Sequence, residues 1–177
     1  MATEDLTPYL AGSTEPWTVD VLCALVTALN PGIVVETGTF EAKTTRRLYE
    51  AMSAQRRSSR LITVEMDPER FQSADTWIRT WQEGFVAVEI WQTDALNALR
   101  QFNDHAVDFV FLDDDHTAGH VAEELLEVKR ILRPGGVCCV HDVIGPFGLD
   151  AVVRAAGGFN LPLERLHAAG GLGVLVA

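Results

Sequence analysis

Residues 34–45 read VVETGTFEAKTT, and this stretch decides the fold. A β-branched run that is typical of a buried strand passes through one glycine into a segment that suits a helix. Gly38 permits a tight turn, and the free N–H groups of the following helix would then point toward the end of the strand. A strand, a turn and a helix in this order predict the first unit of a parallel sheet.

The same alternation continues along the chain. Strands are expected at 33–38, 61–66, 85–92, 107–113 and 137–143, and helices at 17–30, 43–55, 68–82 and 117–132. The strand runs are almost continuously apolar, which is typical of a sheet covered on both faces. Two last extended runs, LPLERLH (161–167) and GLGVLVA, are too close for a helical crossover and must pair antiparallel. The prediction is an α/β, Rossmann-like doubly wound sheet of seven strands, mostly parallel, with an antiparallel C-terminal hairpin strand.

Length and charge narrow the function classes. With 177 residues and a net charge of −11, the chain fits one domain and lacks the clustered basic residues that nucleic acid requires. We expect no membrane span and no secretory signal, because no apolar run is long enough and the first residues are neither basic nor apolar. Cys138 and Cys139 lie in an apolar run and are expected as core residues of a cytoplasmic protein.

The first loop favours a ligand with an amino-acid tail. A helix N-terminus favours a carboxylate, and Glu36 beside it favours an ammonium group. A dinucleotide fingerprint would need glycines where Phe40 and Lys43 stand, which disfavours an NAD-dependent oxidoreductase. Glu65 ends the second strand, where it can accept hydrogen bonds from both ribose hydroxyls of an adenosine. Adenosine with an amino-acid tail and no phosphates describes S-adenosylmethionine.

The ordered motifs VVETGTFEAKTT, ITVEMD, VEIWQTDAL, FVFLDDDH and LRPGGVCCVHDV resemble the class I S-adenosylmethionine-dependent methyltransferases. They are most similar to small-molecule O-methyltransferases of the catechol type and to a related bacterial group with a GG…HD motif. The resemblance covers residues 17–177, which we take as one methyltransferase domain, and leaves 1–16 as an N-terminal extension that could form a partial lid. It departs at Ala42, where relatives carry a second glycine. The cofactor-binding residues that it implies are Glu36, Gly38, Thr39, Phe40, Thr44, Glu65, Met66, Asp94, Ala95 and Asp113.

A second cluster lies in FVFLDDDHTAGH, residues 109–120, where a buried strand ends in adjacent carboxylates. The next strand ends in VHDV, so Asp113 and Asp142 could share a divalent cation on neighbouring strand ends. Val143 stands where catechol-type sites have a further Asn or Asp. Either His141 or Asp115 completes the shell, or no metal binds; histidine ligands would favour a transition metal over Mg²⁺.

The catalytic residues expected at this edge are His116 and His141. Catechol-type relatives place a lysine base three residues after the strand-four aspartate, and His116 matches that position, with a pKa that suits a general base. His120 could pair with His116 and Asp113 as a two-histidine metal site, but a solvated position in the first helical turn is favoured. Asp114 is expected in a capping arrangement before Thr117.

These residues predict an S-adenosylmethionine-dependent methyltransferase that methylates a hydroxyl of a small-molecule acceptor. A non-catalytic S-adenosylmethionine-binding or interaction module is the alternative, because no inserted lid is visible. The cover would come from residues 1–16, from the loop 145–150, from a second subunit in a homo-oligomer, or from a large acceptor.

Overall fold

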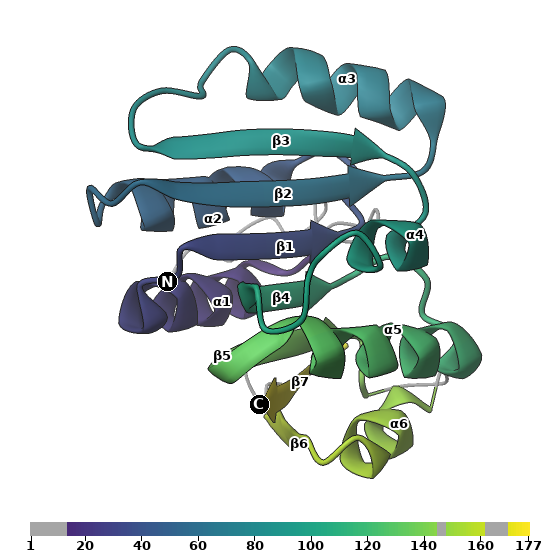
Figure 1. Ribbon diagram of the computed structural model, residues 1–177. Coiled ribbons are helices and arrows are strands. Elements are labelled where there is room, and N and C mark those ends of the chain that lie inside the picture. The colour runs from purple at the N-terminus through teal and green to yellow at the C-terminus, as the bar shows by residue number, and fades with distance from the viewer. Residues whose placement is uncertain (1–13, 145–147, 162–169) are drawn as a thin grey trace, which may run out of the picture.

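A computed structural model describes residues 14–144, 148–161 and 170–177. Within these residues the chain forms one sheet of seven strands in the order β3-β2-β1-β4-β5-β7-β6 (Figure 1). The strands are β1 Ile33–Thr37, β2 Ser59–Glu65, β3 Val86–Gln92, β4 Val107–Leu112, β5 Leu132–His141, β6 Phe159–Leu161 and β7 Leu172–Val176. The helices are α1 Pro16–Leu29, α2 Lys43–Ser53, α3 Pro68–Ile78, α4 Ala95–Leu99, α5 Ala118–Ile131 and α6 Leu149–Ala155.

The strand directions confirm the predicted fold. β1 pairs in parallel with β2 and β4, β2 with β3, and β4 with β5. β7 pairs antiparallel with both β5 and β6, so the last strand is inserted between them. Most of the predicted run 161–167 falls outside the described residues, and β6 instead begins at Phe159.

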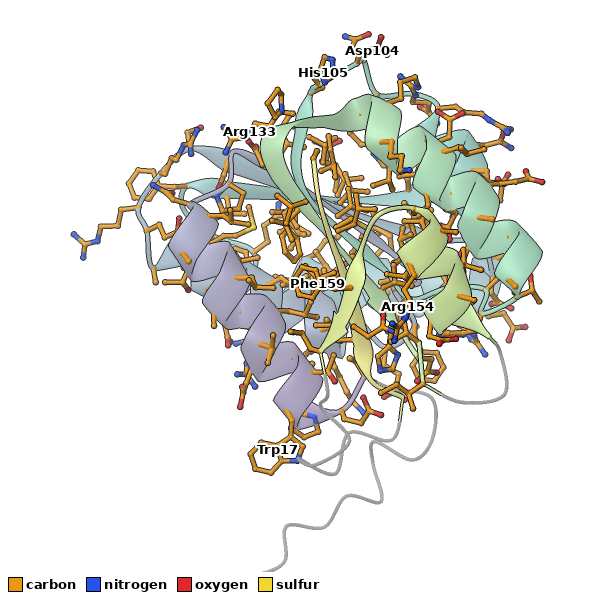
Figure 2. All side chains as sticks on the ribbon, turned by 90° about the horizontal axis from the view of Figure 1, so that it is seen from below. Trp17, Asp104, His105, Arg133, Arg154 and Phe159 are labelled. Carbon is orange, nitrogen blue, oxygen red and sulfur yellow. The ribbon has the colours of Figure 1, made fainter. Side chains whose placement is uncertain are left out.

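Helices cover both faces of the sheet, as Figure 1 shows and Figure 2 shows from below. Val34 and Val35 illustrate why the strands are apolar throughout: neighbouring side chains point to opposite faces, and both are fully buried. Val34 belongs to the core beneath α1, α2 and α3, and Val35 to the core beneath α5 and α6. Each face therefore has its own hydrophobic core, and the sheet is shielded from water on both sides.

Two local differences separate the sequence prediction from the structure. The short helices α4 and α6 were not predicted, because five and seven residues are too few to display a helical period. The stretch RPGG, predicted to stop the preceding helix, lies inside β5, which begins at Leu132 immediately after α5. Gly135 and Gly136 exchange backbone hydrogen bonds with Ala177, which extends the pairing beyond β7.

Cys138 and Cys139 are fully buried free cysteines, as predicted. None of the helices in the described part of the chain has the length and apolar character needed to span a bilayer.

The polar residues that the sequence singled out follow the carboxyl ends of β1, β2, β4 and β5. The strand order reverses between β1 and β4, and ligands of doubly wound sheets bind at such a reversal. At this point the two chains nearly touch. Gly38 has φ +81°, and a Cβ atom built on it would lie 2.2 Å from the carbonyl oxygen of Asp113. Only glycine satisfies both conditions.

We predict that Gly38→Ala lowers the free energy of unfolding by at least about 3 kcal/mol, since backbone must move as well as adopt a disfavoured φ. Gly84→Ala is the matched control, because Gly84 has φ +82° and nothing within 4 Å of the added Cβ. The control should lose only about 1 kcal/mol, the cost of the left-handed conformation. Urea unfolding measures both; equal losses would show that the approach of β1 to β4 is not a constraint.

Candidate active site

The loop after β1 is bound to the neighbouring strand β2. The backbone N–H groups of Gly38 and Thr39 both donate to the carbonyl of Val64, at 3.0 and 3.1 Å. The hydroxyls of Thr39 and Thr63 lie 2.6 Å apart, and Thr39 is 4% exposed. The side chain of Thr39 therefore faces the interior of the loop, and it can present only its backbone to a ligand.

Glu65 completes this attachment from the end of β2. Its Oε2 accepts the N–H of Phe40 at 2.9 Å, and its Oε1 accepts the N–H of Asp67 at 2.9 Å. A carboxylate has further lone pairs, so these two bonds leave acceptor capacity for a ligand. Glu65 thus connects the loop after β1 to β2. It lies at the carboxyl end of β2, as the sequence predicted.

The other residues predicted for the nucleoside end of the cofactor lie at the neighbouring strand ends. Met66 follows Glu65 directly and is 70% exposed, which is unusual for so large an apolar side chain. Asp94 and Ala95 follow β3, and Asp94 caps α4 by accepting the N–H of Asn97 at 2.9 Å. An exposed apolar side chain beside a buried carboxylate is an arrangement that suits an adenosine.

Glu36 lies beneath the loop and does not face solvent. It is 1% exposed, and its Oε2 accepts hydrogen bonds from Thr45 and Thr63 at 2.5 and 2.8 Å. Burial is the largest influence on this carboxyl and raises its pKa to about 8, so it carries a proton at neutral pH. In this structure Glu36 is a buried group that accepts hydrogen bonds from two threonines. That it also contacts the cofactor remains a prediction.

The turn into α2 uses a backbone conformation that L-residues rarely adopt. Phe40 has φ 48°, and Ala42, the N-cap residue of α2, has φ 55°. Ala42 is the position where the resembling family has glycine, and the positive φ explains that preference. In this chain alanine adopts the positive φ, a conformation that costs an L-residue free energy.

The ends of β4 and β5 bring together Glu15, Asp113, His116, His141 and Asp142, which we call the His141 cluster. His141 lies at its centre: Nδ1 is 2.7 Å from Oδ1 of Asp113, and Nε2 is 2.8 Å from Oε2 of Glu15. His141 is 6% exposed. The nearby carboxylates raise the pKa of His141 well above the usual value against the opposing effect of burial, so the ring is a buried cation.

His116 lies between two carboxylates at the rim of this cluster. Its Nε2 is 3.4 Å from Oδ1 of Asp113 and 3.4 Å from Oδ2 of Asp142. The hydrogen bond with Asp113 is the largest influence on His116 and raises its pKa, with burial acting in the opposite direction. His116 and Asp142 therefore lie beside Asp113, as predicted, while the roles predicted for them remain predictions.

Each carboxylate of the DDD run has partners of its own. Asp113 accepts the hydroxyl of Thr14 at 2.6 Å in addition to its contact with His141. Asp114 accepts the hydroxyl of Thr37 at 2.9 Å and lies 3.0 Å from Nε2 of His120. Asp115 accepts the N–H of Thr117 at 2.8 Å. Three adjacent aspartates are therefore tolerated in the sequence, because their carboxylates point to three different sets of partners.

These contacts correct two predictions from the sequence. Asp115, and not Asp114, makes the turn before Thr117, because Asp114 is directed toward β1. His120 is a half-buried partner of Asp114 and not a solvated side chain, and it does not join His116.

Two site residues, Thr14 and Glu15, belong to the extension that was predicted as a partial lid, but neither was assigned a role of its own from the sequence. Glu15 holds His141, and its other oxygen accepts the N–H of Gly170 at 3.3 Å. Thr14 donates to Asp113 and accepts from Thr44 at 3.1 Å. Residues 1–13 of the predicted lid lie outside the described residues, as do 145–147, but the last part of the extension reaches the site. No sequence signal could have placed these residues there, because their partners lie far away along the chain.

The donor set does not match the oxygen-rich shell that Mg²⁺ requires. Asp113 and Asp142 offer oxygens, but Val143 is apolar, and both nitrogens of His141 already contact carboxylates. Asp113, His116 and His141 do place one potential ligand atom each within 4.8 Å of one another. A metal there would have to displace a proton from His141, whose positive charge already compensates Asp113.

Comparison with known proteins adds the family. Residues 35–143 match the model of a family described as a methyltransferase domain. No curated protein sequence matches the chain. An O-methyltransferase from Bacillus cereus solved in complex with SAH has 18% identity and a TM-score of 0.72, over 100% of this chain and 93% of that one.

Two further solved structures have the same fold. The O-methyltransferase TomG from Streptomyces achromogenes, involved in tomaymycin synthesis and solved with SAM, has 19% identity and a TM-score of 0.70, over 94% of this chain and 82% of that one. The SAH-bound methyltransferase PaMTH1 from Podospora anserina has 16% identity and a TM-score of 0.72, over 94% and 80%. At these identities the likeness is one of fold.

We predict that His141→Gln lowers the free energy of unfolding by about 3 kcal/mol near pH 6, because it leaves Asp113 and Glu15 without their buried cation. The folded pKa of His141 is raised, so its contribution is fully present below the unfolded pKa and is lost as pH rises through the folded value. The difference between variant and wild type should therefore shrink in alkaline solution.

Urea unfolding at a series of pH values measures this difference. His105→Gln is the control, because His105 is exposed and lies at the end of the molecule opposite Trp17, as Figure 2 shows. A gap for His141→Gln that stays constant or grows with pH would contradict a charged imidazole.

Proposed function

Because the chain belongs to the methyltransferase domain family, we propose that it is an S-adenosylmethionine-dependent methyltransferase that methylates a hydroxyl of a small molecule. Family membership confirms the methyltransferase identification that was made from the motifs. The cofactor, the oxygen acceptor and the residue roles are our proposal. The O-methyltransferase and cofactor names of the structural neighbours support it.

The proposal rests on the position of the loop between β1 and α2, residues 38–42, relative to the His141 cluster. Gly38 lies against the backbone of Asp113, so the loop that would hold the cofactor meets the β4–α5 connection, which carries His116. Glu65 fixes the loop through Phe40 and retains acceptor capacity for the ribose hydroxyls. Bound there, the cofactor would supply a sulfonium methyl group that an oxygen nucleophile attacks in line.

His116 is our choice for the base that removes the hydroxyl proton. Its buried Nε2 faces Asp113 and Asp142, so the neutral ring would carry its hydrogen there and accept the substrate proton on Nδ1, while the two carboxylates stabilise the resulting imidazolium. His141 is a poorer choice, because both its nitrogens are engaged and the ring is already charged. We propose instead that His141 holds Asp113 ionised and in place, and we assign no step to a metal.

The raised pKa of His116 has a consequence for rate. A base works only when it is deprotonated, so turnover should increase as pH rises through the pKa of His116.

We propose no acceptor more specific than a small molecule with a hydroxyl group. The names of the O-methyltransferase neighbours favour this class.

Calorimetry tests the cofactor. We predict that the wild type binds S-adenosylmethionine and shows no heat with NAD, and that Glu65→Gln weakens cofactor binding at least about 10-fold by removing charge-assisted hydrogen bonds. Glu50→Gln, an exposed change of the same kind in α2, is the control and should bind as the wild type does. Binding of NAD, or unchanged affinity in Glu65→Gln, would contradict the proposed cofactor site.

A mass-based screen of hydroxyl compounds for the gain of one methyl group tests the activity. With an acceptor identified, His116→Ala should reduce turnover at least about 100-fold, in the range for loss of a general base, while cofactor affinity changes little. His105→Ala is the control and should retain turnover. Added Mg²⁺ should not change the rate. Cofactor binding without any methylated product would instead favour a non-catalytic binding module.

A further inference from the structure

A second group of ligating side chains lies beside the proposed active site but takes no part in it. Asp114, His120 and Glu124, which we call the Glu124 cluster, place one oxygen or nitrogen each within 4.8 Å of one another. They come from the β4–α5 connection and from one face of α5, where His120 and Glu124 are four residues apart and therefore neighbours. Asp114 lies within the motif FVFLDDDH, but the mechanism proposed above gives none of the three residues a role.

Glu124 is the unusual member of this cluster. It lies on the buried face of α5, among Val121, Leu125 and Val128, and it is 0% exposed. Both of its oxygens are buried, and neither has a hydrogen bond of good geometry to a described residue, although Asp114 and Thr37 lie close enough to influence its ionisation. Its Oε2 lies 3.8 Å from Nε2 of His120, beyond hydrogen-bond distance. A buried carboxylate left in this way is costly unless it takes up a proton or a cation is supplied.

The other two members are already aimed at the same point. Thr37, at the end of β1, donates to Oδ1 of Asp114 and orients that carboxylate. The second oxygen, Oδ2, is then 3.0 Å from Nε2 of His120. A ligand held from behind by a hydrogen bond is typical of metal sites. Burial, and after it the neighbouring Asp114, raise the pKa of Glu124 to about 10, so a bound cation would have to displace a proton from this carboxyl.

We propose that Asp114, His120 and Glu124 form a binding site for a divalent transition cation such as Zn²⁺. One imidazole nitrogen with two carboxylate oxygens suits Zn²⁺ or Mn²⁺ better than Mg²⁺, which prefers oxygen ligands alone. Three protein ligands with solvent completing the shell is a familiar arrangement for zinc. Such an ion would connect α5 to the β4–α5 connection, and through Thr37 to β1. The inference does not depend on the proposed activity.

The test is Zn²⁺ binding by calorimetry and the shift of melting temperature on adding Zn²⁺, at pH 8, on the full chain. Glu124→Gln keeps the shape of the side chain and removes its charge. Glu123→Gln makes the same change at the neighbouring, exposed position and is the matched control. The wild type and Glu123→Gln should bind Zn²⁺ and melt at a higher temperature with it.

In Glu124→Gln the affinity of one equivalent should fall at least about 100-fold, and the stabilisation by Zn²⁺ should be lost with it. His120→Gln, at a half-exposed position, should lose the same equivalent and guards against a folding defect in Glu124→Gln. Any Zn²⁺ bound by the His141 cluster would appear equally in all four proteins. Mg²⁺ should give no heat at the Glu124 cluster.

The proposal is overturned if the wild type, Glu124→Gln and His120→Gln bind Zn²⁺ with the same number and affinity. It is also overturned if the wild type takes up no Zn²⁺. In that case Glu124 would be a protonated acid packed beside Asp114.

Discussion

The close approach of Gly38 to the carbonyl of Asp113 is the constraint on which the site depends. β1 and β4 are adjacent parallel strands, and the chain leaves them on opposite faces of the sheet. Without a side chain at Gly38, the two departing loops lie against each other. This contact sets the distance between the loop that Glu65 fixes and the strand end that carries the acidic residues. A ligand placed on the first would meet the side chains of the second.

The protonation state of each carboxyl near the contact between Gly38 and Asp113 depends on its immediate partners. Asp113 and Glu15 share the buried cation of His141, and Asp113 keeps a lowered pKa despite its burial. Glu36 has hydroxyl partners only, and its pKa moves in the opposite direction. Carboxyls that lie close together in the sequence or in space thus hold different protonation states. The difference follows from whether a positive partner is within reach.

The sequence was informative where a pattern is local. Continuous apolar runs identified the strands, because both faces of the sheet are covered, and the antiparallel pairing of the last two strands was predicted correctly although the bounds of β6 were not. It was uninformative where one residue type serves two purposes. Glu36 and Asp108 both lie in strands, but Glu36 accepts hydroxyl groups of Thr45 and Thr63, whereas Asp108 accepts the backbone N–H groups of Gly32 and Ile33.

The other contacts in the site could not be predicted because they join residues that are far apart in the sequence. Thr14 is 99 residues from Asp113, and Glu15 is 126 residues from His141, so no spacing rule connects them. The direction of each carboxylate in the DDD run also depends on Thr37 and His120, which approach from other elements. Strand-end position could be predicted from the sequence, whereas the partner of each side chain could not.

The insertion of β7 between β5 and β6 has a consequence for the order of events during synthesis. As the chain leaves the ribosome, β1 to β5 can pair as they emerge, yet one side of β5 must wait until β7 has been made. During that interval the nascent chain exposes a long apolar edge that could pair with another molecule. Among the described strands β6 pairs only with β7, so β6 cannot join the sheet before β7 does.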